Sequence, residues 1–560
     1  MLTKSAPPTD PDIKAEPQIS DDSSPLNVIM LLVDNLRLDS FSDRKEAKAL
    51  FPHIGGLINN GFLCPLTSNG QATKFAMAPI FSQTYPLDHG GYNYVMRDRP
   101  RSFVEEITAH GYQTYMFQAD DNDGPVSQCD RGFDHVEAIY DFRVLLQNFI
   151  VEVLLEECQH WEAGVCTDAD ISELLHQSFG AVLGHLENGT FRVTRPGLSS
   201  WVGYPSNKMK RAFHAERMLL ERDPIAVARK ILTLEPHFYH LCLGQAIPEN
   251  MTLTAFRIIY HIGGGIRSRL VPRSIFPFRV LTGHTSPVAS QLLKGASTAI
   301  KNATRPWFIF AHVMDIHDRR QAHGLTGILS RMAWYPKWAR HRKGPKNVEQ
   351  FLYDSALAKV DREVGKLIGV LKRSGQAHNT VFLVSADHGC EIYDALRRGT
   401  NEDFGWRTHP EHIDVPLICG PTKRQPTDGG LLDSMSFSAT VLDLLGISQH
   451  STFKGFSAFA KRRNVVITEN AGRGNANILD HDLYFTITTQ KFKAMAILTK
   501  NEFQVHRLYD CEADVHELQN IVGDPKQKPV IDVLIDYVFE ERFELLSNRG
   551  VNRNSVQIVT

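Results

Sequence analysis

Three stretches of the chain carry residue types that together could hold a metal ion and activate a hydroxyl group. Asp34 follows the apolar run NVIMLLV, Asp387 and His388 follow TVFLVSA, and Thr73 stands in NGQATK before a helical-looking segment. Carboxylates and imidazoles are common ligands of divalent cations. A cation beside a hydroxyl lowers the hydroxyl pKa and turns it into a nucleophile. Asp34, Asp387 and His388 could therefore hold a metal ion, and the functional interpretation of Thr73 is a metal-activated nucleophile.

Each of these residues also has a structural interpretation. Asp34 and Thr73 are residue types that cap helix N-termini, and for Thr73 the residue type alone favours a cap. His388 could be a hydrogen-bonded histidine of the core. The sequence DHG after a seven-residue apolar run favours the metal interpretation, because a structural strand has no reason to end in two desolvated polar groups.

Two further histidines are candidate catalytic residues. His317 in HVMDIHD and His409 in RTHPEH could donate hydrogen bonds to non-bridging oxygens or protonate a leaving group. His412 competes with His409 for that assignment. A single histidine on a loop is more often structural, and the chain has 24 of them.

Asn35, Arg37 and Asp39 lie directly after Asp34 in VDNLRLD. Asn35 and Arg37 could line the site and bind a substrate. Alternatively, Arg37 and Asp39 could simply form an ion pair at the surface. Both interpretations remain open at this point.

The elements that must position these residues are buried strands. Residues 27–33, 307–313 and 380–386 are continuous apolar runs, as expected of strands covered on both faces of a parallel sheet. Acids or histidines follow each run within four residues, including Asp315 and His317 after the second. In open α/β sheets, sites form at the carboxyl ends of the strands, so we expect these three ends to meet.

The rest of the chain completes an α/β fold. One apolar stripe at helical period predicts a helix that Ser374-Gly375 ends; the stripe is formed by Tyr353, Leu357, Val360, Val364, Leu367 and Leu371. Strand-like segments from residue 464 and a helix over residues 530–546 predict a smaller α+β C-terminal part. We predict a disordered tail over residues 1–25, a catalytic domain over 26–460 with a helical insertion or cap over 140–300, and a C-terminal subdomain over 461–560.

Composition narrows the class of protein. Of the 560 residues, 42% are hydrophobic and the formal net charge is -2, which is ordinary for a globular protein and gives no support for a nucleic-acid or other polyanion-binding protein. The N-terminus has no apolar secretory core, and no run of about 18 apolar residues predicts a membrane anchor. The eight cysteines form no CxxC pair. We expect a cytoplasmic protein with reduced thiols.

At this point the motifs, taken in order, resemble those of the sulfatase family within the alkaline-phosphatase superfamily. NVIMLLVDNLRLDSF resembles the family's opening strand motif and TSNGQATKFAMAPIFSQTYPLDHGGY its nucleophile segment. RPWFIFAHVMDIH, TVFLVSADHG and HIDVPLICGP resemble later motifs, and LYDCEADVHELQNIVGD resembles the C-terminal signature. The resemblance runs from about residue 27 to 524 and implies an alkaline-phosphatase-like fold. It also implies one divalent metal ion, Mn, Zn, Ca or Mg, and a small-molecule, glycan or lipid ester as substrate.

The resemblance implies roles for single residues of this chain, which are assigned by their positions within the motifs. In the family the nucleophile lies thirteen residues before the proline of a T-G-x-Y-P-like segment, and here Pro86 gives Thr73. Asp34 and the pair Asp387-His388 match the metal ligands. His317 matches a substrate-contacting histidine, and His409 matches another in a looser register.

The chain also departs from the sulfatase pattern. Sulfatases place Cys or Ser at the nucleophile position, within C/S-x-P-x-R, because formylglycine is made from these residues. This chain has Thr73, Phe75 and Met77 at the three defined positions, so formylglycine cannot form. Phosphotransferases and phosphodiesterases of the family use Thr. The missing Arg removes a cation that Lys74 could replace as a substrate-binding residue, and Asn35 replaces a second acid, which indicates a single metal.

Three hypotheses follow from this comparison. The first is a metal-dependent phosphoester hydrolase or transferase with Thr73 as its nucleophile. The second is a sulfuric ester hydrolase that works without formylglycine. The third is a catalytically inactive binding protein that keeps the fold. Residue content favours the first over the second, and the intact residues Asp34, Asp387 and His388 disfavour the third.

Overall fold

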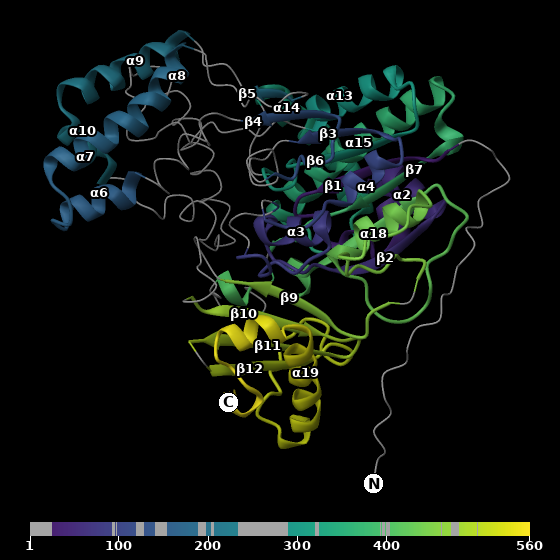
Figure 1. Ribbon diagram of the computed structural model, residues 1–560. Helices are drawn as coiled ribbons and strands as arrows, with labels where there is room; N and C mark the ends of the chain where they lie inside the picture. Colours follow the sequence, from purple (N-terminus) through teal and green to yellow (C-terminus); the bar gives the residue numbers. More distant parts are fainter. Residues whose placement is uncertain are drawn as a thin grey trace.

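The structure is a computed structural model that describes residues 25–559, except for 92–95, 97, 119–127, 141–153, 189–197, 203–206, 233–288, 320–323, 393, 395–397, 399–403, 461, 472–480 and 501. Within this part of the chain, two sheets organise the molecule (Figure 1). A large sheet with flanking helices forms the main body. A smaller sheet from the C-terminal part lies beside it.

The large sheet has eight strands in the order β2-β8-β7-β1-β6-β3-β4-β5. Strands β7, β1, β6, β3, β4 and β5 pair in parallel, and β8 is antiparallel to both β7 and β2. This mixed, mostly parallel sheet confirms the predicted α/β fold class. Its strands are β1 (Asn27–Val33), β2 (Phe62–Thr67), β3 (Gln113–Gln118), β4 (His135–Tyr140), β5 (Leu198–Val202), β6 (Trp307–Val313), β7 (Thr380–Ser385) and β8 (Asp414–Gly420).

The three apolar runs predicted as strands are immediate neighbours. Strand β1 lies between β6 and β7, in register from Val28 opposite Phe308 and from Asn27 opposite Thr380. All residues of the three strands are buried, because helices cover both faces of the sheet at this point. Parallel pairing places their carboxyl ends at one edge, which is why segments more than 270 residues apart in sequence meet there.

Helices cover the large sheet on both faces. One layer contains α1 (Arg44–Leu50), α2 (Pro52–Asn59), α13 (Ala289–Asn302), α14 (Gly324–His341) and α15 (Val348–Arg373). The other contains α3 (Thr73–Ser82), α4 (Phe103–Ala109) and α18 (Ser434–Leu444). Short helices connect these elements: η1 (Leu38–Phe41), η7 (Ala377–Asn379), η8 (Phe404–Trp406) and α17 (Pro410–Ile413). The predicted apolar stripe lies on α15, whose C-cap is Ser374 and which Gly375 follows with a positive φ of 72°.

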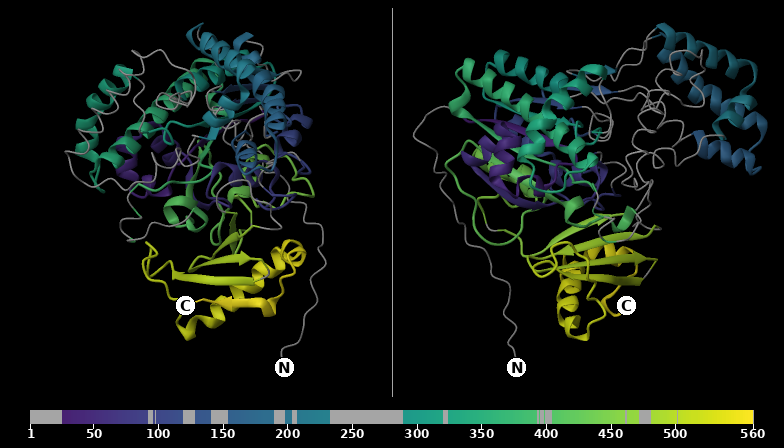
Figure 2. Two further views of the ribbon diagram at one scale, coloured as in Figure 1. Left: turned by 90° about the vertical axis from the view of Figure 1, so that its left-hand side faces the viewer. Right: turned by 180° about the vertical axis from the view of Figure 1, so that it is seen from behind.

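A group of helices lies to one side of the main body (Figures 1 and 2). It contains α6 (Leu155–Glu162), α7 (Asp168–Leu175), the π-helical turn η5 (His176–Gly180), α8 (Ala181–Asn188), α9 (Asn207–Arg222) and α10 (Pro224–Leu232). Its helices pack on one another, but β5 within the same range joins the large sheet and α13 packs on β3 and β6. The range 140–300 therefore contains parts of the main body as well as the helical group.

The second sheet has the order β13-β12-β11-β10-β9. Its strands are β9 (Val466–Asn470), β10 (Leu483–Thr488), β11 (Phe492–Thr499), β12 (Glu502–Asp510) and β13 (Val556–Ile558), and they pack with η9 (Pro525–Gln527), α19 (Lys528–Glu541), α20 (Phe543–Asn548) and η10 (Arg553–Ser555). The predicted smaller C-terminal part is confirmed, whereas the boundary at residue 460 stays a prediction. The single helix expected over 530–546 is broken at Arg542, whose side chain forms ion pairs with Asp88 and Glu469.

None of the described helices combines the length and the apolar character that crossing a bilayer requires. The seven cysteines in the described part of the chain are all free thiols.

Candidate metal and nucleophile site

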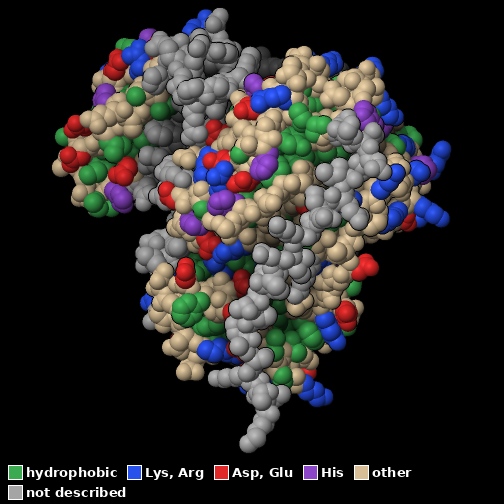
Figure 3. All heavy atoms as spheres, turned by 45° about the vertical axis from the view of Figure 1, so that its right-hand side comes forward, with side chains coloured by type: hydrophobic (Ala, Val, Ile, Leu, Met, Phe, Trp, Pro, Cys, Tyr) green, Lys and Arg blue, Asp and Glu red, His purple; other side chains and the backbone are tan. Residues whose placement is uncertain are grey.

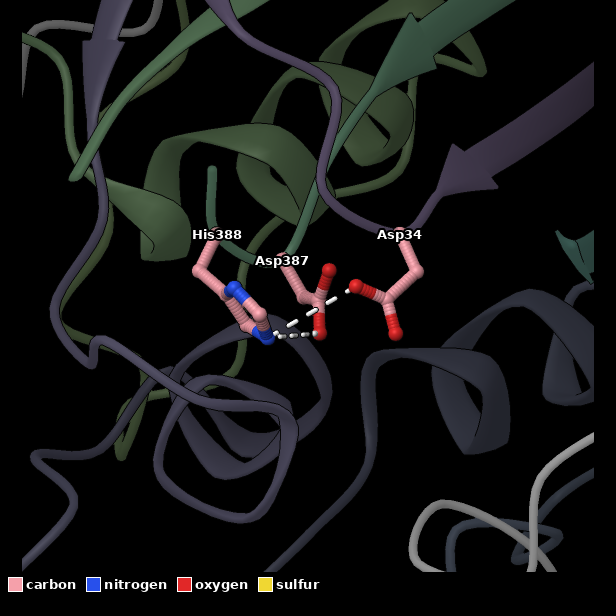
Figure 4. Close-up of side chains that lie close together, drawn as sticks. All are labelled: Asp34, Asp387 and His388. Carbon is pink, nitrogen blue, oxygen red and sulfur yellow. Dashed lines mark ion pairs between the residues drawn. The ribbon is translucent and has the colours of Figure 1, made fainter. Parts of the chain in front are cut away.

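The carboxyl ends of β1 and β7 bring two aspartates and a histidine together (Figure 4). Asp34 follows β1, and Asp387 and His388 follow β7. The Nε2 atom of His388 lies 3.4 Å from Oδ2 of Asp387 and 3.7 Å from Oδ1 of Asp34. One candidate ligand atom from each residue lies within 4.8 Å of the others, and all three residues are buried. This spacing suits three ligands around one cation.

The orientation of His388 is fixed by its other ring nitrogen. Nδ1 lies 2.7 Å from the carbonyl oxygen of Gly389, which can only accept a hydrogen bond, so Nδ1 carries the proton. In the neutral imidazole, Nε2 therefore presents its lone pair to the two carboxylates. A lone pair directed at two carboxylate oxygens is electrostatically unfavourable by itself, and a cation between the three groups removes the conflict.

The carboxylates show the same need for a positive partner. All four carboxylate oxygens of Asp34 and Asp387 are buried, and none receives a hydrogen bond from the described residues. Burial, followed by the charge of Asp387, raises the pKa of Asp34 to about 6. Buried carboxylates without donors are costly, because the water that solvated them has been removed. The donor set fits a divalent cation.

Thr73 lies next to this group at the first residue of α3. Its Oγ1 is 3.4 Å from Nε2 of His388. The helix N-cap is Ala72 and makes no side-chain capping bond, so the helix-cap interpretation of Thr73 is wrong. Since the hydroxyl is not used by the helix, it is available at a positive helix N-terminus that favours negative charge on a nearby group.

The loop after β1 holds Asn35 in a left-handed backbone conformation, with a φ of 66°. Such a conformation is uncommon for residues other than glycine and persists only when its surroundings enforce it. Here the Tyr353 hydroxyl donates to the carbonyl oxygen of Asn35 at 3.1 Å, and the amide of Arg37 donates to the Tyr353 hydroxyl at 2.8 Å. Tyr353 of α15 thus holds the turn that presents Asp34.

The guanidinium of Arg37 is engaged by protein groups. It donates to both carboxylate oxygens of Asp39, at 3.0 and 2.6 Å, and to Asp394 at 2.6 Å and the carbonyl of Cys390 at 3.1 Å. The Arg37–Asp39 pair left open by the sequence is therefore present, although Arg37 is buried. Its contacts tie the loop after β1 to the loop after β7. Lys74 follows Thr73 in α3 and is half-buried. The substrate-binding roles of Asn35, Arg37 and Lys74 stay predictions.

Two histidines from the β6 region lie near Asp34. The charges of His317 and His312 both lower the pKa of Asp34, although less strongly than burial raises it. The ring of His317 lies beside Asp318, with 3.0 Å between Nδ1 and Oδ1, and its side chain is 39% exposed. Residue type alone did not identify His312, which lies buried within β6. A histidine inside a run of apolar residues was the available signal.

His409 is fully buried and bonded to the C-terminal part of the chain. Its Nδ1 lies 2.5 Å from Oε2 of Glu517, and the other carboxylate oxygen of Glu517 lies 2.5 Å from Nζ of Lys493. Interaction with Lys493 and His409 overcomes desolvation and lowers the pKa of Glu517. An ionised Glu517 accepts a hydrogen bond from Nδ1–H of His409. Nε2 is then the ring nitrogen of His409 that Glu517 does not engage. Neither Glu517 nor Lys493 was singled out from the sequence.

Helix α17 connects His409 to the turn that contains Asp387, His388 and Gly389. His409 is its N-cap, and the amide of Gly389 donates to the carbonyl oxygen of His412 at 2.7 Å. A Cβ atom on Gly389 would lie 2.2 Å from the carbonyl oxygen of Glu411. Glycine is therefore required after His388 so that the turn can approach α17 closely. Burial, together with the charge of His409, holds the pKa of His412 well below its usual value, which suits a neutral structural ring.

Phe75 and Met77 are buried apolar residues at the positions of the sulfatase motif where this chain departs from it. Phe75 packs in the core of the C-terminal part and Met77 in the main core. The segment of α3 after Thr73 consequently provides packing where the sulfatase motif has a proline and an arginine.

Comparison with known proteins shows that part of the chain is similar to sulfatases. A family model described as Sulfatase matches residues 272–447, which include Asp387, His388, His317 and His409. An N-acetylglucosamine-6-O-sulfatase of Bacteroides thetaiotaomicron is 24% identical over 36% of this chain and 39% of its own length. An arylsulfatase of Clostridium perfringens is 25% identical over 36% of this chain and 41% of its own length. The matches thus span about two fifths of these curated relatives.

Residues 272–447 are thus similar to the Sulfatase family, and the fold of the chain is similar to that of a solved sulfatase structure. Solved structures share its fold over nearly the whole length. A 2-O GAG sulfatase matches with a TM-score of 0.50 and 12% identity over 93% of both chains. A phosphonate monoester hydrolase of Agrobacterium radiobacter matches with a TM-score of 0.50 and 15% identity, over 94% of this chain and 96% of that one. At such identities the likeness to these family structures concerns the fold alone.

Proposed function

We propose that this chain is a metal-dependent hydrolase or transferase of phosphate or sulfate esters, and that Thr73 as nucleophile favours phosphoesters. The observation that carries the proposal is the position of the Thr73 hydroxyl, 3.4 Å from the lone-pair nitrogen of His388 and beside two buried carboxylates that lack donors among the described residues. Asp34, Asp387, His388 and Thr73 would hold one divalent cation. When bound, the cation lowers the hydroxyl pKa and polarises the ester.

In the proposed reaction, Oγ1 of Thr73 attacks phosphorus and the bond from phosphorus to the leaving oxygen breaks. Water then attacks the phosphothreonine, phosphate leaves and the threonine hydroxyl is restored. The departing alkoxide needs a proton, which His317 or His409 in its protonated form would donate; the same ring would then accept a proton from the attacking water. Glu517 accepts from Nδ1–H of His409 and would favour the charged ring, whose Nε2–H would be the proton donor.

Sulfuric ester hydrolysis is the alternative function, supported by the sulfatases among the relatives. Thr73 argues against it, because formylglycine, which sulfatases use, is not made from threonine. A plain hydroxyl can attack phosphorus, whose esters are the substrates of the threonine enzymes that this segment resembles. The relatives' names do not select the substrate, which would be a small molecule or a glycan or lipid ester.

The test is a panel of aryl phosphate, phosphodiester, phosphonate and sulfate esters with one common leaving group, assayed with Mn, Zn, Ca and Mg. The protein is produced in cells that lack formylglycine-generating activity. We expect metal-dependent turnover with a higher kcat/KM for a phosphoester than for the sulfate ester. A preference for the sulfate ester would favour the alternative, and no turnover with any metal would favour an inactive binding protein.

A further inference from the structure

A groove of about 660 Å³ runs between α13 and α15 on the outside of the large sheet. The two helices pack side by side (Figure 2). Five cationic side chains line the groove: Lys294 and Lys301 from α13, and Arg362, Lys366 and Arg373 from α15. Glu363 is the one carboxylate among the lining residues, and it forms an ion pair with Lys366 at 2.7 Å.

The cations form two matched stripes. On α13, Ser290, Lys294, Ser297 and Lys301 are spaced four, three and four residues apart, which places them on one face of the helix. On α15, Arg362, Lys366, Gly369 and Arg373 have the same spacing. Both stripes line the same groove, so positive side chains face one another across it.

Only Lys366 among these five cations is paired with an acid of the groove. Lys294, Lys301, Arg362 and Arg373 have no ion-pair partner among the described residues. Independent solvated lysines would be expected at scattered positions, or paired with acids four residues away on the same helix. Like charges on facing stripes repel one another, and an anion between them removes that repulsion. The ring of His53 covers Gly365 on the α15 wall, since a Cβ atom there would lie 2.4 Å from Nε2 of His53, whereas Gly369 contributes only backbone to the wall.

The groove is separate from the metal site. The N-terminal half of α15 reaches that site, where Tyr353 contacts Asn35. Arg362 lies nine residues and Arg373 twenty residues farther along the same helix, which is about 14 and 30 Å at the ordinary helical rise. Lys294 and Lys301 are seven residues apart, or about 10 Å. A ligand that uses both stripes therefore needs several anionic groups spread over about 10 Å.

We propose that the groove between α13 and α15 is a second, non-catalytic binding site for a ligand that carries several sulfate or phosphate groups. The site arises from the local alignment of two helices, so the balanced net charge of the chain does not indicate it. Lys and Arg side chains also gather along the right-hand edge of the molecule in Figure 3. The site does not require the proposed ester chemistry.

The test measures calorimetric binding of three probes to the full chain: sucrose octasulfate, inositol hexakisphosphate and inorganic phosphate. The groove variant Lys301→Gln/Arg373→Gln is compared with the control Arg340→Gln/Lys372→Gln. Both variants remove one Lys and one Arg from the last turns of exposed helices, but the control residues do not line the groove. The charge change and the effect on the helix dipoles are therefore matched.

We expect at least one polyanion to bind far more tightly than inorganic phosphate, with an affinity that falls as salt rises. The groove variant should bind it about tenfold more weakly, and the control within twofold of the parent. The tighter of the two polyanions shows whether sulfate or phosphate groups are preferred. Equal affinity of the two variants, or no polyanion binding by a folded parent, would overturn the proposal. Ester turnover should be unchanged in both variants, and a parent inactive on every ester would leave this test intact.

Discussion

Replacing Thr73 by alanine separates chemistry from folding more cleanly than any other change. If Thr73 is the nucleophile, Thr73→Ala should lower kcat/KM on the best phosphoester by about 10³-fold or more, which corresponds to about 4 kcal/mol of transition-state stabilisation. Ala72, not Thr73, is the N-cap of α3, so no capping bond is lost. The variant loses one mostly buried methyl group, about 0.8 kcal/mol, and gains about 0.5 kcal/mol of helix propensity. The free energy of unfolding should therefore change by less than about 1 kcal/mol.

The assay compares steady-state kinetics and denaturant unfolding for the parent, Thr73→Ala and Thr73→Ser. Serine keeps the hydroxyl and should restore most of the turnover. Ser82→Ala is a matched control, because it removes a buried hydroxyl from the other end of the same helix, where Ser82 bonds to Ala78 and Thr84. Parent-like turnover by Thr73→Ala would refute the assignment, whatever its stability.

Three further predictions concern metal binding, the C-terminal contact and pH. Asp34→Asn removes a charged candidate ligand, so the metal affinity measured by titration should fall and excess metal should partly restore turnover. Thr73→Ala should stay inactive at any metal concentration. An Asp34→Asn protein that binds metal as tightly as the parent would contradict the proposed site. Glu517→Gln leaves Lys493 buried without the carboxylate that it pairs with, so the unfolding free energy should fall by about 3 to 5 kcal/mol. Adding Lys493→Met should recover much of that loss. If the losses of the two single variants simply add in the double variant, the two side chains are not energetically coupled. Burial raises the pKa of Asp354 to about 6, above an ordinary value near 3.9, so the folded protein holds a proton that the unfolded chain releases between about pH 4 and 6. This contribution to stability is lost as pH rises through that window. The unfolding free energy of Asp354→Asn should therefore rise by about 3 kcal/mol relative to that of the parent between pH 4 and 7. A difference in unfolding free energy that does not change with pH would contradict the raised pKa of Asp354.

The sequence was sufficient for the parts of the fold that carry a local signal. Buried parallel strands are continuous apolar runs, so residues 27–33, 307–313 and 380–386 could be recognised, and their polar ends indicated the site. The apolar stripe of α15 and the end of that helix before Gly375 could also be predicted from neighbouring residues in the sequence. By contrast, β12 alternates irregularly in EFQVHRLYD and was not predicted as a strand. The break at Arg542 also lacks a local signal, since it depends on the distant acids Asp88 and Glu469.

For the site, too, the sequence predicted what local signals indicate but not what depends on residues far apart in the chain. The residues Asp34, Thr73, Asp387 and His388 could be proposed from their positions next to predicted elements. The sequence predicted that the strand ends meet, but not the distances between the side chains, which depend on the direct pairing of β1 with β7. His409 bonds to Glu517, which lies 108 residues away in the loop after β12, and no sequence periodicity connects the two. Pairing of this kind is decided by tertiary packing.

The stereochemical course at phosphorus is the most direct test of the claim that Thr73 attacks the ester. A phosphorothioate ester made chiral with two oxygen isotopes is turned over by the parent protein in water that carries the third isotope, and the configuration of the released thiophosphate is determined. Attack by Thr73 followed by attack of the acceptor gives two in-line displacements, so the account predicts net retention of configuration. Net inversion would mean a single displacement by water or the acceptor, and would contradict a covalent role for Thr73.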